Sequence, residues 1–445
     1  MNSKKKNLAT RLEHCIMPTM TAMTILLLSG LSFAAAAEDS VFTRLLGEGK
    51  QVFAKAKESS KPEDYQRAAE ILEQAAARNP KNAEVHYFLG YAYDRSPGVL
   101  TQEAQPTPNV PFAQKVASEM AKAISLSPRY EGEIIALDPY SKLASAWGAL
   151  ANCYMFRGQI DSVQWAFEQG RSQGAYGPAW LEYTRNVMAS CEPDAILFAN
   201  GDMDTFPVWF LQVMERYRTD IVLVNLSLLN NAPYAAQLKR NYPFGHNKLP
   251  LTLSDSEIDS LRRLPWTEQT VEVPVKPDSL NPEGVIRWTV KSTLRGSLRV
   301  QDQLVLDILR ANRGQRPVYF GATVSRANLL GLEEYLPLEG LLFRLNSHKG
   351  ERIAVQQLHR NCFDVYHYES LSDPLWQLSP DLAKMGQNLR SGFMQLAYFQ
   401  STQGQRAEAK RVLDFMNEKL PESKLPYSSP QLKVELDKLY KSVSE

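Results

Sequence analysis

The feature that most constrains the fold is a strand, a helix and a second strand that follow one another within residues 194–229. "DAILFA" (194–199) is a short apolar run, and "DIVLVNLSLL" (220–229) is rich in β-branched residues, as in a strand buried on both faces. Between them, "FPVWFLQVMERY" (206–217) carries its large apolar residues at helical spacing. This order predicts two parallel strands joined by a right-handed crossover.

More strands and helices extend this α/β region. "DQLVLDILRAN" (302–312) predicts a helix, and "RPVYFGATV" (316–324) predicts another buried strand. Between them, "TVEVPV" and "VIRWTV" alternate apolar and polar residues, which predicts an antiparallel pair or edge strands. We therefore predict an α/β sandwich over residues 176–372, with a mostly parallel sheet and helices on both faces.

A repeated helical pattern occupies both flanks. Residues spaced by 4, 3 and 5 positions occur twice in the first half, at Ala68, Leu72, Ala75 and Pro80 and again at Val116, Met120, Ala123 and Pro128. Small residues at such positions let two helices approach closely, and the proline ends the second helix. The pattern resembles the tetratricopeptide repeat and returns over 393–421. We predict all-α, tetratricopeptide-like hairpins at 38–175, interrupted by a proline-rich loop at 96–111, and a C-terminal helical repeat region at 373–445.

The first 37 residues have the pattern of a secretory signal peptide. A basic start precedes an apolar stretch at 23–33, and the small residues Ala35 and Ala37 suit a cleavage site. This predicts an exported protein, periplasmic or secreted, with no membrane span after cleavage; an uncleaved anchor is the alternative. Removal of residues 1–37 leaves 46 basic and 48 acidic residues, a balance that argues against a nucleic-acid partner.

The remaining cysteines and the histidines show no metal-binding pattern. Cys153, Cys191 and Cys362 are widely spaced and give neither a disulfide framework nor a zinc spacing. We expect buried thiols, although one pair could form a bridge. His359 and His367 are also not at a metal-binding spacing. No nucleophile motif, phosphate-binding loop or dinucleotide fingerprint occurs, so no metal or cofactor is predicted.

The candidate site is the loop after the first predicted strand. Open parallel sheets bind ligands beyond the carboxyl ends of their strands, where Asn200, Asp202, Asp204 and Thr205 lie. We expect the following helix to begin near Phe206-Pro207, with Asp204 or Thr205 as its cap. Three roles remain for the two aspartates: structural capping, which we favour, binding of a sugar or other ligand, and binding of a hard divalent cation.

Other polar residues follow the later strands. Asn225 and Ser227 end the second strand and could face the same crevice, or they could satisfy backbone groups of the loop. Glu333 and Glu339 follow the third strand and could bring a carboxylate near Asp202 to make a paired-carboxylate site. Solvation at the surface is the simpler expectation for these glutamates.

Three motifs carry a family resemblance. "LFANGDMDTFPVWFLQVMERYRTDIVLVNLSLLN", "LDILRANRGQRPVYFGATVS" and "GLEEYLPLEGLLFRL" resemble, in this order, the soluble tail of a bacterial membrane family described as protein O-mannosyltransferase-like. The resemblance covers about residues 176–421. The tail usually reads Gly-Asp-Asn-Asp-Thr-Phe-Pro, where this chain has Met203 in place of the asparagine. The catalytic part of that family is its membrane region, which this sequence lacks, so a transferase assignment does not carry over; the resemblance implies an exported α/β domain with a shared strand-end loop.

Two functions remain in view. The favoured one is a non-catalytic binding or scaffolding protein, which binds a protein partner through its helical repeats; a glycan is a candidate ligand for its α/β domain. Trp147, Trp165 and Trp180 could supply stacking faces, although Trp147 suits a repeat core better. The alternative is an extracytoplasmic enzyme that acts on carbohydrate through Asp202 and Asp204. An enzyme needs acid, base or metal groups that converge on the loop.

Overall fold

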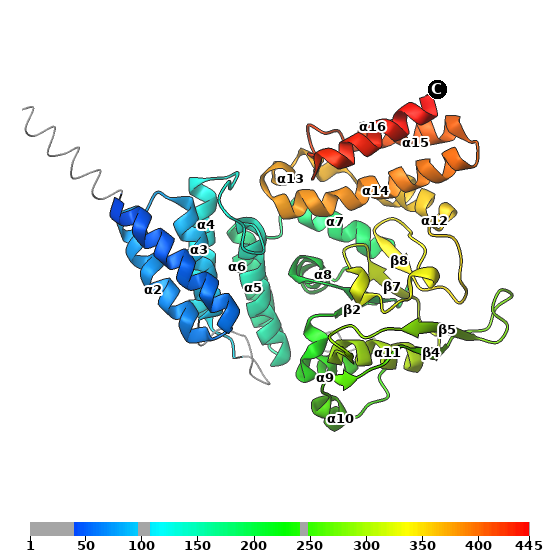
Figure 1. Cartoon of the computed structure of the whole chain (residues 1–445), viewed down its shortest axis with the longest axis horizontal. Helices are drawn as coiled ribbons and strands as arrows, with labels where there is room; N and C mark the ends of the chain where they lie inside the picture. Colours follow the sequence, from blue (N-terminus) through cyan, green and yellow to red (C-terminus); the bar gives the residue numbers. More distant parts are fainter. Residues whose placement is uncertain (1–39, 97–106, 241–247, 445) are drawn as a thin grey trace, which may run out of the picture. The chain divides into compact units, whose positions relative to one another are not determined.

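The computed structural model describes residues 40–96, 107–240 and 248–444 (Figure 1). The predicted signal peptide and most of the predicted loop at 96–111 lie outside these residues. The chain divides between Pro97 and Gly98 into two compact units, which are described separately. No helix in the described ranges is long and apolar enough to cross a membrane.

The first unit consists of helices. A helix over residues 40–59 is followed by α2 (Pro62–Arg78) and α3 (Ala83–Arg95). Ala68, Leu72 and Ala75 of the repeated pattern are fully buried. Pro62 lies in the first turn of α2, where its missing N–H costs nothing, and Asn82 caps α3 by accepting the Val85 N–H at 3.0 Å. The helical hairpin predicted here is confirmed.

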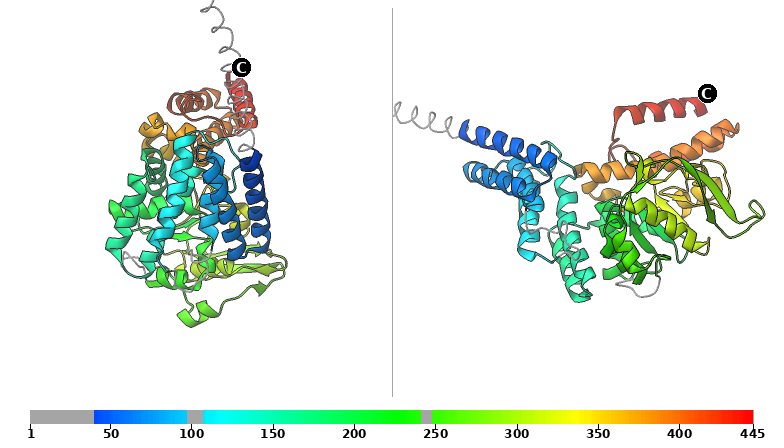
Figure 2. Two further views of the ribbon diagram at one scale, coloured as in Figure 1. Left: turned by 90° about the vertical axis from the view of Figure 1, so that its left-hand side faces the viewer. Right: turned by 60° about the horizontal axis from the view of Figure 1, so that its bottom comes forward.

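The second unit begins and ends with helices. Four precede the sheet, α4 (Val110–Leu126), α5 (Pro139–Phe156), α6 (Ile160–Ser172) and α7 (Pro178–Ala189), and three form the C-terminus, α14 (Pro380–Thr402), α15 (Arg406–Lys419) and α16 (Pro430–Ser444). Gly158, at a φ of 74°, makes the turn between α5 and α6. Trp147 is fully buried and packs edge-to-face on Trp165. The C-terminal helices lie next to one another in both views of Figure 2.

The central sheet has the strand order β2-β1-β7-β8. Its strands are β1 (Ile196–Ala199), β2 (Val222–Asn225), β7 (Val318–Gly321) and β8 (Leu342–Arg344). β1 pairs in parallel with both β2 and β7, whereas β8 is antiparallel to β7. Every residue of β1, β2 and β7 is buried, in agreement with the apolar runs of the sequence. The mostly parallel sheet is confirmed, but it is small, with only four short strands.

The chain changes direction across this sheet. α8 (Asp202–Met214) connects β1 to β2, and α11 (Val300–Asn312) leads back to β7 on the other side of β1. Right-handed connections in opposite directions favour opposite faces of the sheet for α8 and α11. The carboxyl ends of β1 and β7 therefore form a topological switch point, the usual ligand position in open sheets.

Smaller elements surround the sheet. They are α9 (Ala232–Arg240), α10 (Asp255–Ser260), α12 (Val355–Arg360), α13 (Leu375–Leu378) and the short pair of β3 (Leu264–Pro265) with β6 (Ser297–Leu298). β4 (Gln269–Pro274) and β5 (Val285–Val290) form a two-stranded antiparallel ribbon. The ribbon buries Val271 and Val273 against Trp288, so the antiparallel pair predicted from the alternating pattern is confirmed.

Two aspartates link the C-terminal segment to α5. Each of them, one at the start of α5 and one at the start of α14, accepts the backbone N–H of the other. Asp138, the cap of α5, accepts the Asp381 N–H at 3.0 Å and the Ser379 hydroxyl at 2.5 Å. In return Asp381 accepts the Asp138 N–H at 2.7 Å. Burial, together with the charge of Asp381, raises the pKa of Asp138 to about 6. The first turns of α5 and α14 are thereby joined by carboxylates.

The three described cysteines are buried and unbridged, as expected for small apolar side chains. Burial raises the pKa of the Cys153 thiol to about 12. Of the histidines His359 and His367, His359 stacks on Phe363 with ring centroids 4.4 Å apart. Within the described ranges, no group of three His, Cys, Asp or Glu side chains is placed to hold a metal ion.

Candidate functional site

Helix α8 begins earlier than the sequence predicted. Its N-cap is Gly201, and Asp202 and Asp204 both lie in its first turn. The predicted start near Phe206 is therefore wrong, and Pro207 lies inside the helix. Two carboxylates in the first turn suit the helix dipole, and Asp204 also accepts the N–H of Gly201, as the third residue of a capping box does. These contacts start the helix ahead of the proline.

Asp202 joins α8 to α5. The hydroxyl of Ser145, a buried residue of α5, donates to Asp202 Oδ2 at 2.6 Å. The two helices approach closely here: a Cβ on Gly148 would lie 2.3 Å from the Phe206 ring, so only glycine leaves room for it. The carboxylate of Asp202 therefore lies at a helix–helix contact and fixes one helix on the other.

Asp204 joins the carboxyl ends of β1 and β7. Its Oδ2 accepts the hydroxyl of Thr323 at 2.9 Å, and its carboxyl group also accepts the N–H groups of Asn200 and Gly201. Burial raises the pKa of Asp204 to about 6 against these hydrogen bonds. The cavity beside it measures about 20 Å³, which is room for about one water molecule. A sugar does not fit there.

Thr205 and Asn225 form a buried pair. Asn225 Nδ2 donates to Thr205 Oγ1 at 2.8 Å, and the same hydroxyl donates to the Gly201 carbonyl at 2.7 Å. Asn225 Oδ1 accepts the Leu228 N–H at 2.9 Å. Thr205 is therefore not a helix cap but a link between α8 and the end of β2.

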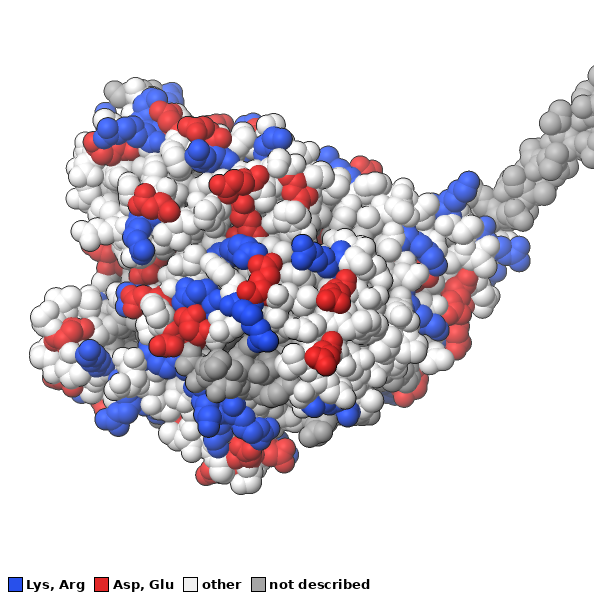
Figure 3. All heavy atoms as spheres, turned by 180° about the vertical axis from the view of Figure 1, so that it is seen from behind, with Lys and Arg blue, Asp and Glu red and all other residues white. Residues whose placement is uncertain are grey.

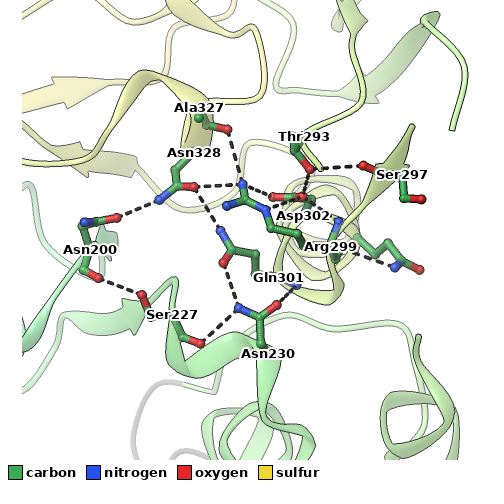
Figure 4. Close-up of polar contacts among 11 residues, drawn as sticks. Asn200, Ser227, Asn230, Thr293, Ser297, Arg299, Gln301, Asp302, Ala327 and Asn328 are labelled. Atoms are coloured by element: carbon green, nitrogen blue, oxygen red, sulfur yellow. Dashed lines mark hydrogen bonds and ion pairs between the residues drawn. The ribbon is translucent and has the colours of Figure 1, made fainter. Parts of the chain in front are cut away.

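Asn200 and Ser227 belong to a wider polar network at the carboxyl edge of the sheet (Figure 4). Asn328 Nδ2 donates to Asn200 Oδ1 at 2.7 Å, and the Ser227 hydroxyl donates to the Asn200 carbonyl at 3.1 Å. Gln301 Nε2 donates to Asn328 Oδ1 at 3.2 Å, while Asn230 Nδ2 donates to Gln301 Oε1 at 2.8 Å. Amides from three strand-end loops and the first turn of α11 thus pair with one another.

Arg299 closes this network on its far side. Its Nη2 donates to Asn328 Oδ1 at 2.9 Å and pairs with Asp302 Oδ1 at 2.9 Å. Thr293 also donates to the Asp302 carboxylate, which is 1% exposed (Figure 4). No motif in the sequence pointed to Arg299, Gln301 or Asn328. The one indication available was their position in the chain: Asn328 follows β7, and Arg299 and Gln301 lie at the start of α11, next to the same edge of the sheet.

The glutamates after β7 do not approach Asp202. Glu333 and Glu334 lie exposed in the 3-10 helix η3 (Glu333–Tyr335). Glu339 is 4% exposed, and burial raises its pKa to about 7, with Arg344 lowering it and Glu192 raising it further. The prediction of a carboxylate near Asp202 is wrong for Glu339, because its charged neighbours are Arg344 and Glu192. The expectation that these glutamates are solvated at the surface is also wrong for Glu339, which is buried, but it is correct for Glu333, which is exposed.

A groove of about 820 Å³ lies along α7, away from the predicted loop. We call it the α7 groove; its charged lining residues are Arg171, Glu182, Arg185, Glu215, His367 and Glu369. Residues 367–372 form one wall, and the end of α6 contributes Arg171. No motif links these residues, which lie far apart in the chain, so the sequence did not indicate them.

Two carboxyl groups meet in the α7 groove. Glu182 accepts the N–H of Ser370 at 3.0 Å and its hydroxyl at 2.6 Å, and it is hydrogen-bonded to Glu369. Burial raises the pKa of Glu182, and the charge of Glu369 raises it further. The pKa of Glu369 is lowered by its own backbone N–H and by the bond from Glu182. Glu182 is thus the harder of the two groups to ionise.

The contact between Asp202 and Ser145 gives a first testable prediction. We expect Asp202→Ala to lower the free energy of unfolding by about 1–2 kcal/mol, since it leaves a buried hydroxyl without its acceptor. In a double-mutant cycle with Ser145→Ala, the double mutant should lose about 1 kcal/mol less unfolding free energy than the sum of the two single-mutant losses. Additive losses in urea unfolding would contradict the contact.

Comparison with known proteins gives one family. The family model of TMEM260-associated domain 2 matches residues 181–272 and 267–360. The matched residues run from α7 to the end of α12 and include the sheet and the polar network. Comparison with curated proteins finds no significant match. The matched residues therefore cover the α/β region and most of α7, and they do not include α4, α5, α6 or α14 to α16.

Proposed function

We propose that this chain is an exported, non-catalytic binding protein, whose α7 groove holds an extended polypeptide segment that carries lysine or arginine. The observation that supports this best is the pair of glutamates, Glu182 and Glu369, in a groove of about 820 Å³. The acids of the strand-end loop are by contrast engaged within the chain, Asp202 with Ser145 and Asp204 with Thr323.

The chemistry of the pair favours a cationic partner. The charges of Glu182 and Glu369 repel each other, and burial of Glu182 adds to the cost of ionising it. An ammonium or guanidinium group that enters the groove lowers this cost by pairing with the carboxylates. Of the basic lining residues, Arg185 is already paired with Glu215, and Arg171 lies over the Phe210 ring, 5.8 Å from its centroid. His367 Nδ1 lies 3.5 Å from Glu369, whereas Glu182 forms no ion pair in the described part of the chain and is left for the partner.

The remaining surface supports a protein partner rather than a nucleic acid. Figure 3 shows acidic and basic side chains interspersed over one face, without a broad basic field. Helical hairpins next to the groove offer further contact area for a protein, and resemblance to tetratricopeptide repeats points the same way. The basic and apolar start of the sequence supports export to the periplasm or the medium.

Peptide binding tests this function. In fluorescence anisotropy, a labelled peptide of alternating alanine and lysine should bind, and one of alternating alanine and glutamate should not. Glu182→Gln resembles the protonated glutamate and keeps an acceptor for Ser370, so it should preserve the fold. We expect it to weaken lysine-peptide binding about tenfold, the effect of one lost charge-assisted hydrogen bond.

The matched control is Glu268→Gln, which changes an exposed glutamate outside the groove. It should leave the affinity for the lysine peptide unchanged. Equal binding of the two peptides, or equal loss in both variants, would show general charge attraction and would refute the α7 groove as the site.

An enzyme that acts on carbohydrate through Asp202 and Asp204 is the alternative function. It would need both carboxylates to reach a sugar, whereas the cavity beside Asp204 measures about 20 Å³. A glycan bound without hydrolysis remains compatible with the binding function. Release of nitrophenol from nitrophenyl glycosides, lost in Asp204→Asn, would favour the enzyme over the binding protein.

A further inference from the structure

A second cavity lies at the opposite edge of the sheet from the predicted loop. It measures about 490 Å³ and includes Pro317 and Val318 at the start of β7 and Arg344 at the end of the antiparallel β8. The loop between α11 and β7 and the start of the β4–β5 connection complete its wall. We call it the amino-edge cavity. It shares no lining residue with the α7 groove.

The charges of this cavity are unequal. Four basic residues line it, Lys276, Arg316, Arg344 and His348, against the acids Glu192 and Asp278. Glu192 pairs with Arg344 at 2.7 Å. Asp278 accepts the N–H groups of Leu280 and Asn281 at 2.8 Å. Both acids therefore have partners inside the chain. Of the three lysine and arginine side chains in the lining, Lys276 and Arg316 are left without an ion pair in the described part of the chain.

Those two cations are Arg316 and Lys276. The guanidinium of Arg316 donates to the carbonyls of Asp194 at 2.6 Å and Lys248 at 2.9 Å, and no carboxylate in the described part lies within ion-pair distance. Burial lowers the pKa of Arg316, while the charges of Asp194 and Asp220 raise it. Lys276 makes no hydrogen bond or ion pair with any residue that the structure describes.

The backbone brings these two cations to one wall. Gly314 adopts a φ of 68°, and a Cβ there would lie 2.5 Å from the backbone nitrogen of Lys276. Only glycine allows this approach of the loop before β7 to the end of β4. The apolar side chains of Val273, Leu309 and Val318 form the remaining floor. A small polar ligand with one anionic group matches this lining, and the volume suits one or two sugar rings.

We propose that the amino-edge cavity binds an acidic sugar, whose carboxylate or phosphate is held between Lys276 and Arg316. The site is separate from the α7 groove and does not depend on the function proposed for it. It gives the α/β domain a ligand of its own, recognised by charge-assisted hydrogen bonds from a lysine and a guanidinium.

Ligand-observed NMR titration of the full chain tests this site with galacturonate, glucose 6-phosphate and glucose. We expect the charged sugars to bind and glucose not to bind. Lys276→Gln should weaken binding about tenfold, since Lys276 has no structural contact to lose. Lys291→Gln, which changes an exposed lysine outside the cavity, is the matched control and should bind as the wild type does.

The outcomes separate the possibilities. Binding of only one charged sugar supports the site and identifies the anion as carboxylate or phosphate. Equal binding of glucose, binding of no charged sugar, or an equal loss in Lys276→Gln and Lys291→Gln would overturn the proposal. Arg316→Lys, checked for folding by thermal unfolding, should weaken the same ligand as Lys276→Gln does.

Discussion

Replacing Arg390 by methionine should lower the free energy of unfolding by about 4 kcal/mol. Arg390 is fully buried in α14 and forms no ion pair with any residue that the structure describes. Its guanidinium donates to Gln387 Oε1 at 2.8 Å, to the Leu420 carbonyl at 2.9 Å and to the Leu425 carbonyl. Methionine fills most of the volume but leaves these buried acceptors without donors, which is the costly part of the change.

The measurement is urea unfolding followed by circular dichroism. Arg411→Met on α15 is the matched control, because Arg411 is exposed and pairs only with Glu408 on the surface. Its loss should stay within about 0.5 kcal/mol. If the two variants lost similar unfolding free energy, the hydrogen bonds from Arg390 to the carbonyls after α15 would not stabilise the fold. A lysine at 390 should recover little, since one ammonium cannot reproduce the planar fork of donors.

Lowering the pH from 8 to 5 should stabilise the protein. The pKa of Glu339 is raised to about 7 in the folded state against an ordinary value of 4.5, so the folded chain takes up a proton that the unfolded chain does not hold. The stability from Glu339 is therefore fully present below pH 4.5 and is lost as the pH rises through 7. The shift corresponds to about 3 kcal/mol, and Asp138 and Asp204, each raised to about 6, act in the same direction.

Urea unfolding at a series of pH values measures this effect. Glu339→Gln removes the titrating group, so its unfolding free energy should vary by about 3 kcal/mol less over the range. Glu333→Gln changes an exposed glutamate of the same segment and should keep the wild-type dependence. A wild-type protein that loses stability between pH 8 and 5 would contradict the burial of these carboxyl groups.

The order of the elements could be predicted from the sequence because it depends on local patterns. Apolar runs identified β1, β2 and β7, and alternation identified the β4–β5 ribbon. The start of α8 was misplaced by Pro207, a residue that local rules assign to a first turn. Contacts of Asp202 and Asp204 with Ser145 and Thr323, far away in the chain, outweighed that rule.

The candidate sites also divide into what local patterns could locate and what only distant contacts decided. The loop of Asp202 was located from its position after a strand, but its occupation by internal hydrogen bonds depends on α5 and on the loop after β7. The α7 groove and the amino-edge cavity combine residues from distant segments, such as Glu182 with Glu369 and Lys276 with Arg316. No spacing in the sequence joins such residues, so no local pattern could identify them.

By itself, the sequence determined where the strands and helices lie, since apolar periodicity and the small residues of the hairpins act between near neighbours. Only the tertiary structure decided which polar side chains are engaged. It buried Glu339 beside Arg344, brought Glu182 to Glu369, and left Lys276 and Arg316 without an ion pair in the described part of the chain. The physical reason is that desolvation and charge pairing depend on which distant segments meet in space.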